Sequence, residues 1–102
     1  MASINVNAGN DGDTTLIAAP GAGLCIVVTH FTLTGKTTAG TATLKSGSTT
    51  HGSFSLGTSG GVSQDGSVED PLFTCEPNQA LVINNSAGLD TQGMVVFGIR
   101  NA

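Results

Sequence analysis

Hydrophobic and polar residues alternate along most of the chain, in short runs that glycine, proline and asparagine separate. The run at 3–8 places Ile4 and Val6 on one face and polar residues on the other. Alternation with a period of two is typical of β-strands, and no window shows the apolar spacing of a helix. We therefore expect no helix. The expected strands lie near 3–8, 14–20, 24–35, 41–47, 50–57, 72–77, 80–86 and 93–101, and 61–71 is mostly a loop with room for one weak strand.

Two of the expected strands are apolar on both faces. The longest is LCIVVTHFTLTG at 24–35, and the other is the stretch 94–99. A strand with two apolar faces is covered on both sides, so we expect both to be central in a sheet or to lie at a subunit interface. Under strict alternation the longest strand carries Cys25, Val27, Thr29, Phe31 and Leu33 on one face, and Leu24, Ile26, Val28, His30 and Thr32 on the other.

The number and spacing of these strands predict the fold class. About eight strands, roughly 8–12 residues apart and joined by turns rich in Gly, Pro and Asn, are typical of an antiparallel sandwich or barrel. We expect an all-β protein with a single antiparallel, jelly-roll-like β-sandwich over residues 1–102, with residues 1–10 free to extend as an N-terminal arm. The longest flexible segment is expected at 57–71.

Charge is scarce in this sequence. Charged residues make up 10% of the chain, and three Lys and Arg against seven Asp and Glu give a net charge of −4. Three basic side chains are too few to neutralise a nucleic-acid backbone or to bind an anionic membrane surface. We therefore expect neither partner. Polarity comes instead from Thr, Ser, Asn and Gly, and a neutral surface of this kind suits close packing against protein.

The sequence also bears on cellular location. The N-terminal stretch MASINVNAGNDGD has neither the basic segment nor the apolar segment of a signal peptide. No apolar run approaches the roughly 20 residues that cross a bilayer. We expect a protein that is made and kept in a cytosol, at least until assembly.

The two cysteines, Cys25 and Cys75, are expected to be buried free thiols, because a reducing compartment disfavours disulfides. A disulfide between them remains the alternative, and in the chain-entropy model it would stabilise the fold by about 4 kcal/mol. Neither cysteine has the spacing of a zinc motif, and the histidines are scattered. We expect no metal and no cofactor.

Candidate catalytic groups do not form a recognisable set. His30 and His51 lack ligand spacing, so we interpret them as one strand and one loop histidine. The NDGD stretch at 10–13 resembles a fragment of a calcium loop but fits a β-turn better. No phosphate-binding or nucleophile motif occurs. The carboxylates Asp65, Glu69 and Asp70 fall in a segment expected to be an exposed loop, and the chain has no Trp or Tyr that would bind sugar.

A resemblance supplies the leading hypothesis. The block LCIVVTHFTLTGKTTAGTATLKSGSTTHGSFSLG joins an apolar strand to a small-residue turn and the run TATLKSG, and the later block PLFTCEPNQALVINNSAG precedes a last apolar strand. Over about residues 24–99 this arrangement resembles the small β-sandwich capsid decoration, or cement, proteins of tailed bacteriophages and cyanophages. Similar modules occur in phage tail fibres, but a chain of 102 residues without shaft repeats favours decoration.

The resemblance implies a structural, non-enzymatic virion protein on the capsid surface, made in the host cytoplasm. Its partners would be the major capsid protein and further copies of itself, with a trimer favoured over a dimer. Two alternatives stay open: a receptor- or glycan-binding head of a tail fibre, and a small β-sandwich hydrolase or lyase. An enzyme would need histidines and carboxylates to come together, and the sequence places them apart.

Partner contacts are expected on the strand faces opposite the core, in the N-terminal run and in two loops. The N-terminal run could add a strand to the open edge of a neighbouring sheet, which would involve Ser3, Ile4, Asn5 and Val6. The loops at 36–40 and 57–70 are the other accessible segments. In the first of these loops, Lys36, Thr37 and Thr38 are the candidate contact residues.

Overall fold

The structure is a computed structural model that describes residues 2–9 and 12–102. Within these residues the chain forms nine strands and no helix. The strands are β1 (Ala2–Ala8), β2 (Gly12–Ile17), β3 (Leu24–Gly35), β4 (Gly40–Ser46), β5 (Thr49–Leu56), β6 (Gly61–Asp65), β7 (Phe73–Thr74), β8 (Leu81–Asn85) and β9 (Thr91–Asn101).

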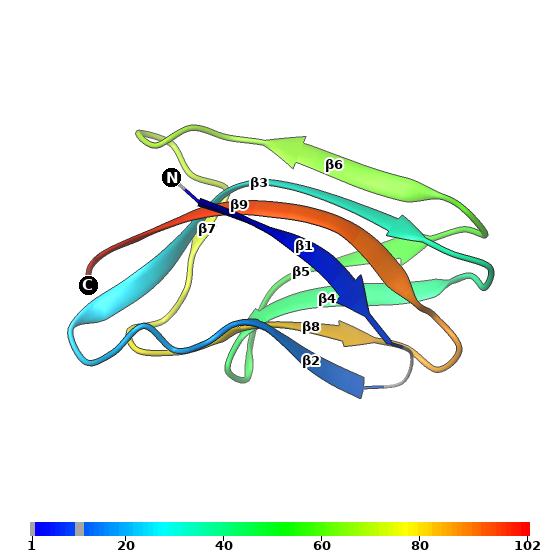
Figure 1. Cartoon of the computed structure of the whole chain (residues 1–102), viewed down its shortest axis with the longest axis horizontal. Coiled ribbons are helices and arrows are strands. Elements are labelled where there is room, and N and C mark those ends of the chain that lie inside the picture. The colour runs from blue at the N-terminus through cyan, green and yellow to red at the C-terminus, as the bar shows by residue number, and fades with distance from the viewer. Residues whose placement is uncertain (1, 10–11) are drawn as a thin grey trace.

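Two antiparallel sheets pack face to face (Figure 1). One has the order β1-β9-β3-β6, with the short β7 also paired to β3, and the other has the order β2-β8-β4-β5. The pairs β1–β9, β2–β8, β3–β6 and β4–β5 are nested, as they are when one long hairpin is rolled into two sheets. This is jelly-roll topology, so the predicted all-β sandwich is confirmed.

Most expected strands are present within a few residues of their predicted ends. The weak strand within 61–71 is β6, and the strand expected over 72–77 shortens to the two residues of β7. Residues 2–8 do not extend as an arm in this chain. They form β1, which pairs with β9 along its length, from Ala2 opposite Phe97 to Ala8 opposite Thr91.

The core lies between the two sheets. β3 and β9 are central in their sheet, as predicted, because each is flanked on both sides. The rings of Phe31 and Phe54 meet across the core with centroids 5.2 Å apart. Burying a large apolar side chain contributes about 1.5–3 kcal/mol. The buried set comes from both sheets and includes Val6, Ile26, Val28, Phe31, Leu33, Ala42, Leu44, Leu56, Leu81, Ile83 and Val95.

The prediction for the faces of β3 is wrong, because a β-bulge interrupts its alternation. The register with β9 shifts between Val28 and His30, so Thr29 is an extra residue. An extra residue reverses which side chains face the core. Ile26 and Val28 therefore face the core before the bulge, and Phe31 and Leu33 face it afterwards. The two faces predicted under strict alternation are each divided at Thr29.

β9 passes close to β3 at Gly93. This residue has φ of +151°, and a Cβ atom there would collide with the backbone carbonyl of Thr32. We expect Gly93→Ala to lower the free energy of unfolding by about 3 kcal/mol, through backbone strain and overpacking. Urea denaturation measures the change.

The matched control is Gly57→Ala, because a Cβ atom at Gly57 meets nothing within 4 Å. We expect the control to stay within about 0.5 kcal/mol of the wild type. A Gly93→Ala variant as stable as the control would contradict this close approach of β9 to β3.

Candidate partner-binding surface

The two sheets present different outer faces to solvent. In each sheet, alternate residues turn away from the core. We call the outer side of the β1-β9-β3-β6 sheet the Met94 face, and that of the β2-β8-β4-β5 sheet the Asp13 face. By register, the residues on the Met94 face include Ser3, Asn5, Asn7, Val27, His30, Thr32, Thr34, Ser63, Asp65, Gln92, Met94 and Val96. Those on the Asp13 face include Asp13, Thr15, Thr41, Thr43, Lys45, Ser53, Ser55, Val82 and Asn84.

Side chains on the Asp13 face bind one another. Asn84 Nδ2 donates to Asp13 Oδ1 at 2.7 Å, and Lys45 Nζ lies 3.1 Å from the same oxygen. The bond from Asn84, and then that from Lys45, lowers the pKa of the Asp13 carboxyl. The hydroxyls of Thr43 and Ser53 lie 3.0 Å apart. This polar face therefore satisfies much of its own hydrogen bonding.

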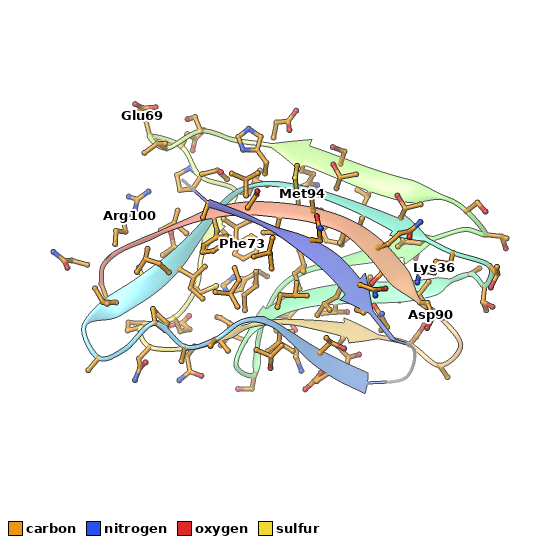
Figure 2. All side chains as sticks on the ribbon, in the orientation of Figure 1. Lys36, Glu69, Phe73, Asp90, Met94 and Arg100 are labelled. Carbon is orange, nitrogen blue, oxygen red and sulfur yellow. The ribbon has the colours of Figure 1, made fainter. Side chains whose placement is uncertain are left out.

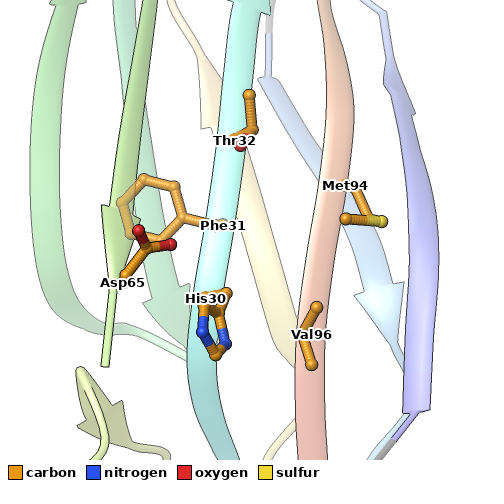
Figure 3. Close-up of a pocket in the computed structure, with 6 residues that line it drawn as sticks. All are labelled: His30, Phe31, Thr32, Asp65, Met94 and Val96. Atoms are coloured by element: carbon orange, nitrogen blue, oxygen red, sulfur yellow. The ribbon is translucent and has the colours of Figure 1, made fainter. Parts of the chain in front are cut away.

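Exposed apolar surface characterises the Met94 face. Met94 is 44% exposed, although a methionine side chain is ordinarily buried. It borders a shallow pocket of about 240 Å³, in which Met94 and Val96 project from β9 beside His30 and Thr32 of β3 (Figure 3). Asp65 of β6 closes the pocket on its far side. The pocket floor and walls are mainly hydrocarbon.

A second apolar pocket, also of about 240 Å³, lies further along the same face. The loop after β6 crosses the sheet here, and Arg100 Nη2 donates to the Val68 carbonyl at 3.1 Å. Arg100 lies at the end of the molecule where the chain terminates (Figure 2). The pocket is lined by Val27, Val68, Gly98, Ile99 and Arg100. In the part of the chain that the structure describes, the exposed large apolar side chains are Val68, Met94 and Ile99, and all three line these two pockets.

The structure separates the partner residues expected in β1. Ser3 and Asn5 point outward on the Met94 face, whereas Ile4 packs against the core and Val6 is 2% exposed. Side-chain contacts from β1 to a partner are therefore open to Ser3 and Asn5 but closed to Val6. Sequence alternation had already placed Ile4 and Val6 on one face.

The expected loop residues approach the end of β1. Lys36 Nζ donates to Asn7 Oδ1 at 3.2 Å, and Thr37 and Thr38 are exposed beyond it. The result is an open polar depression of about 620 Å³. Sequence reasoning missed four of its residues, Asn7, Thr34, Gln92 and Gly93, because no local pattern shows that β1, β3 and β9 meet here. The full lining is Asn5, Val6, Asn7, Thr34, Lys36, Gln92 and Gly93.

Ser46 and His51 contact each other at the end of the sandwich away from Lys36. Ser46 Oγ lies 2.7 Å from His51 Nε2 and accepts the Glu76 backbone N–H at 3.1 Å. The His51 ring stacks on Phe73, with centroids 4.6 Å apart. Because Ser46 is only 1% exposed, a substrate cannot reach its hydroxyl. This pair fastens β4, β5 and residue 76 together and is not placed for nucleophilic catalysis.

The remaining titratable groups are dispersed. Asp65 is the register partner of His30, but Glu69 and Asp70 lie further along the exposed loop. Residues 10 and 11 of the NDGD stretch lie outside the described residues, and Asp13 binds Asn84 and Lys45. In residues 2–9 and 12–102, no group of three or more His, Cys, Asp and Glu side chains is arranged to hold a metal ion.

Both cysteines are buried free thiols, as predicted. Burial above all, together with the nearby Cys25 and Glu76, raises the pKa of the Cys75 thiol to about 12. A thiol with so high a pKa is protonated near neutral pH and is a poor nucleophile. Nucleophilic chemistry is therefore not supported at Cys75.

Comparison of the chain with known proteins found no relative. No protein-family model matches the chain, and neither curated proteins nor solved structures give a match. Among the described residues, no helix is long and apolar enough to cross a membrane.

The stability of the folded protein should depend on pH through the imidazole of His51. Burial lowers the pKa of its imidazole below the usual 6.5, and the carboxylate of Glu76 opposes this only in part. On acidification the unfolded chain therefore takes up the proton first. The stability contributed by neutral His51 is complete above about pH 6.5 and is lost as the pH falls through the folded pKa. We expect the melting temperature to fall between about pH 7.5 and 5.

His51→Gln should weaken this pH dependence of the melting temperature, because the glutamine side chain does not titrate. His30→Gln is the matched control, since it retains His51. The pKa of Asp13 lies below its usual 3.8, so its protonation falls outside the window. Equal pH profiles for the wild type and His51→Gln would refute the role of His51.

Thiol accessibility is a separate prediction. Cys25 and Cys75 are 4% and 2% exposed, so neither should react with Ellman's reagent in the folded protein. Both should react once urea unfolds the chain. Rapid reaction of the native protein would contradict their burial.

Proposed function

We propose that this chain is a structural, non-enzymatic virion protein that binds the outside of a phage capsid and cements neighbouring capsomers. Its proposed partner is the major capsid protein. The jelly-roll body is compatible with the resemblance to capsid decoration proteins noted over residues 24–99. The proposal concerns binding between protein surfaces and requires no pocket for a small substrate.

The observation that carries the proposal is the difference between the two outer faces. The Asp13 face is polar and largely paired with itself. The Met94 face exposes Met94 and Val68 among mostly uncharged side chains, with Asp65 at the pocket of Met94 and Arg100 at the pocket of Val68. Exposed apolar patches with polar rims mark interaction sites. We therefore assign the Met94 face to the capsid and the Asp13 face to solvent.

Few charges and many copies fit this role. A contact surface with few charges gains affinity mainly from apolar burial and hydrogen bonds, and few ions lose their hydration on binding. Further copies of the chain are the second proposed partner. When several subunits are tethered together, modest contacts multiply into a firm hold on the shell.

A receptor- or glycan-binding head of a tail fibre is the alternative. Sugar sites commonly use exposed aromatic rings, and the chain has no Trp or Tyr. Phe31 is 2% exposed, and Phe54, Phe73 and Phe97 pack against the core. The four phenylalanines therefore contribute to folding, which leaves capsid binding as the stronger candidate.

Co-sedimentation with undecorated heads of the phage that carries this gene tests the proposal. We expect the wild-type chain to bind, and Met94→Lys to weaken binding by about tenfold or more, which is about 1.4 kcal/mol. The added charge would be buried at the contact. Ser55→Lys is the control, because Ser55 is exposed on the Asp13 face.

Each outcome bears on the assignment. Loss of binding in Met94→Lys alone supports the Met94 face. Loss in Ser55→Lys alone would transfer the contact to the Asp13 face. A wild-type chain that never sediments with heads would overturn the capsid role, and glycan-array binding would then favour the tail-fibre alternative.

A further inference from the structure

β1 is an edge strand without the usual protection of an edge. It is the last strand of its sheet, with β9 on one side only (Figure 1). Apart from its ladder with β9, the backbone of β1 makes one hydrogen bond among the described residues. In that bond Asn85 Nδ2 donates to the Ala8 carbonyl at 3.4 Å. Its sequence, ASINVNA, has no charge, no proline and no bulge. Natural edge strands commonly carry one of these devices against pairing.

The other sheet edges are protected. β2 carries Asp13 and has an irregular register between Thr15 and Ile17. β5 has an extra residue at His51, where its register with β4 shifts. β6 has only five residues and ends at Asp65. β1 is therefore the one long, regular and uncharged edge among the described strands.

The sequence of β1 is also nearly palindromic in residue type. Read from either end, it runs small, polar, β-branched, Asn, β-branched, polar, small. If two copies meet antiparallel about Asn5, Ile4 of each copy lies opposite Val6 of the other, and Asn5 lies opposite Asn5. Ser3 then meets Asn7, and Ala2 meets Ala8. Ile4 and Val6 would lie on the core side, where Val6 is already covered within its own subunit, and the polar side chains would lie together on the Met94 face.

We propose that β1 pairs antiparallel with β1 of a second copy across a two-fold axis at Asn5, joining two sheets into one. Such an interface is self-complementary, as a two-fold axis requires. An uncharged strand brings no like charges together, although each copy has a net charge of −4. The unpaired N–H and C=O groups of every second residue would bond to the partner strand. The result is a dimer, in contrast to the trimer favoured by the resemblance.

Light scattering on the isolated chain tests this pairing without any capsid, so it can fail or succeed independently of capsid binding. We expect twice the chain mass of 10.1 kDa. Asn5→Lys places two like charges opposite each other at the axis and should raise the dimer dissociation constant at least tenfold. Ser63→Lys is the control, since Ser63 lies in the same row of the Met94 face at the opposite edge.

Charge pairing makes the test specific. Asn5→Asp alone should also be monomeric, but an equimolar mixture of Asn5→Lys and Asn5→Asp should recover the dimer. Melting temperatures near the wild-type value would show that both variants fold. A monomer at all concentrations, a trimer, or a dimer indifferent to charge at residue 5 would each overturn the proposal.

Cross-linking provides a second readout. Because Cys25 and Cys75 are buried, Asn5→Cys introduces the one exposed thiol, and a short bis-maleimide should link two chains. Ser63→Cys should give little linkage. Equal linkage in both variants would indicate random collision and would overturn the pairing at β1.

Discussion

One extra residue in β3 determines what lies on either side of the larger sheet. Thr29 shifts the register, so that Val28 before it and Phe31 after it both face the core. Without this bulge Phe31 and Leu33 would face solvent, at a cost of about 1.5–3 kcal/mol for each lost burial. The bulge is held on both sides: Gly66 donates its N–H to the Thr29 carbonyl at 2.6 Å, and Thr29 Oγ1 donates to the Val96 carbonyl at 3.3 Å.

The same bulge shapes the Met94 face. The loop after β6 is anchored at Gly66 on Thr29, and it returns to the sheet where the Leu72 N–H donates to the Val28 carbonyl at 2.9 Å. Between these anchors the loop carries Val68, which is 55% exposed and lines one pocket together with the buried Val27. One apolar pocket therefore lies on each side of the bulge. The arrangement that completes the core also divides the exposed apolar surface into two parts.

The pattern of apolar and polar residues was sufficient to locate the strands, but it did not show which segments pack against each strand. Alternation located Ile4, Leu44 and Ile83 on the core side of their strands because each strand is regular there. It failed at Thr29, since a bulge is a tertiary feature that is stabilised by the distant residues Gly66 and Val96. The candidate site was predictable only in part for the same reason.

Lys36 and Met94 belong to surfaces that form only when distant segments of the chain come together. Lys36 was expected at an accessible loop, but its bond to Asn7 joins residues that are far apart in the chain. Met94 was not singled out, because alternation shows which side of a strand a residue occupies and not whether another segment covers it. On the same face Val27 is 1% exposed and Met94 is 44% exposed, a difference that nothing in the local sequence reveals.

The placement of the few charges links the two proposed contacts. Lys45 and Asp13 are paired on the opposite face, whereas Glu69 and Arg100 lie towards one end of the molecule and Lys36 and Asp90 towards the other (Figure 2). β1 and the central part of β9 are left neutral. Copies with the same net charge repel one another over a Debye length of about 8 Å at physiological ionic strength. A close contact between copies is therefore least opposed where no charged side chain must be desolvated, and β1 meets that condition. Met94 also carries no charge, although Asp65 lies on the far side of its pocket, so binding there would rest mainly on shape, hydrogen bonds and apolar burial.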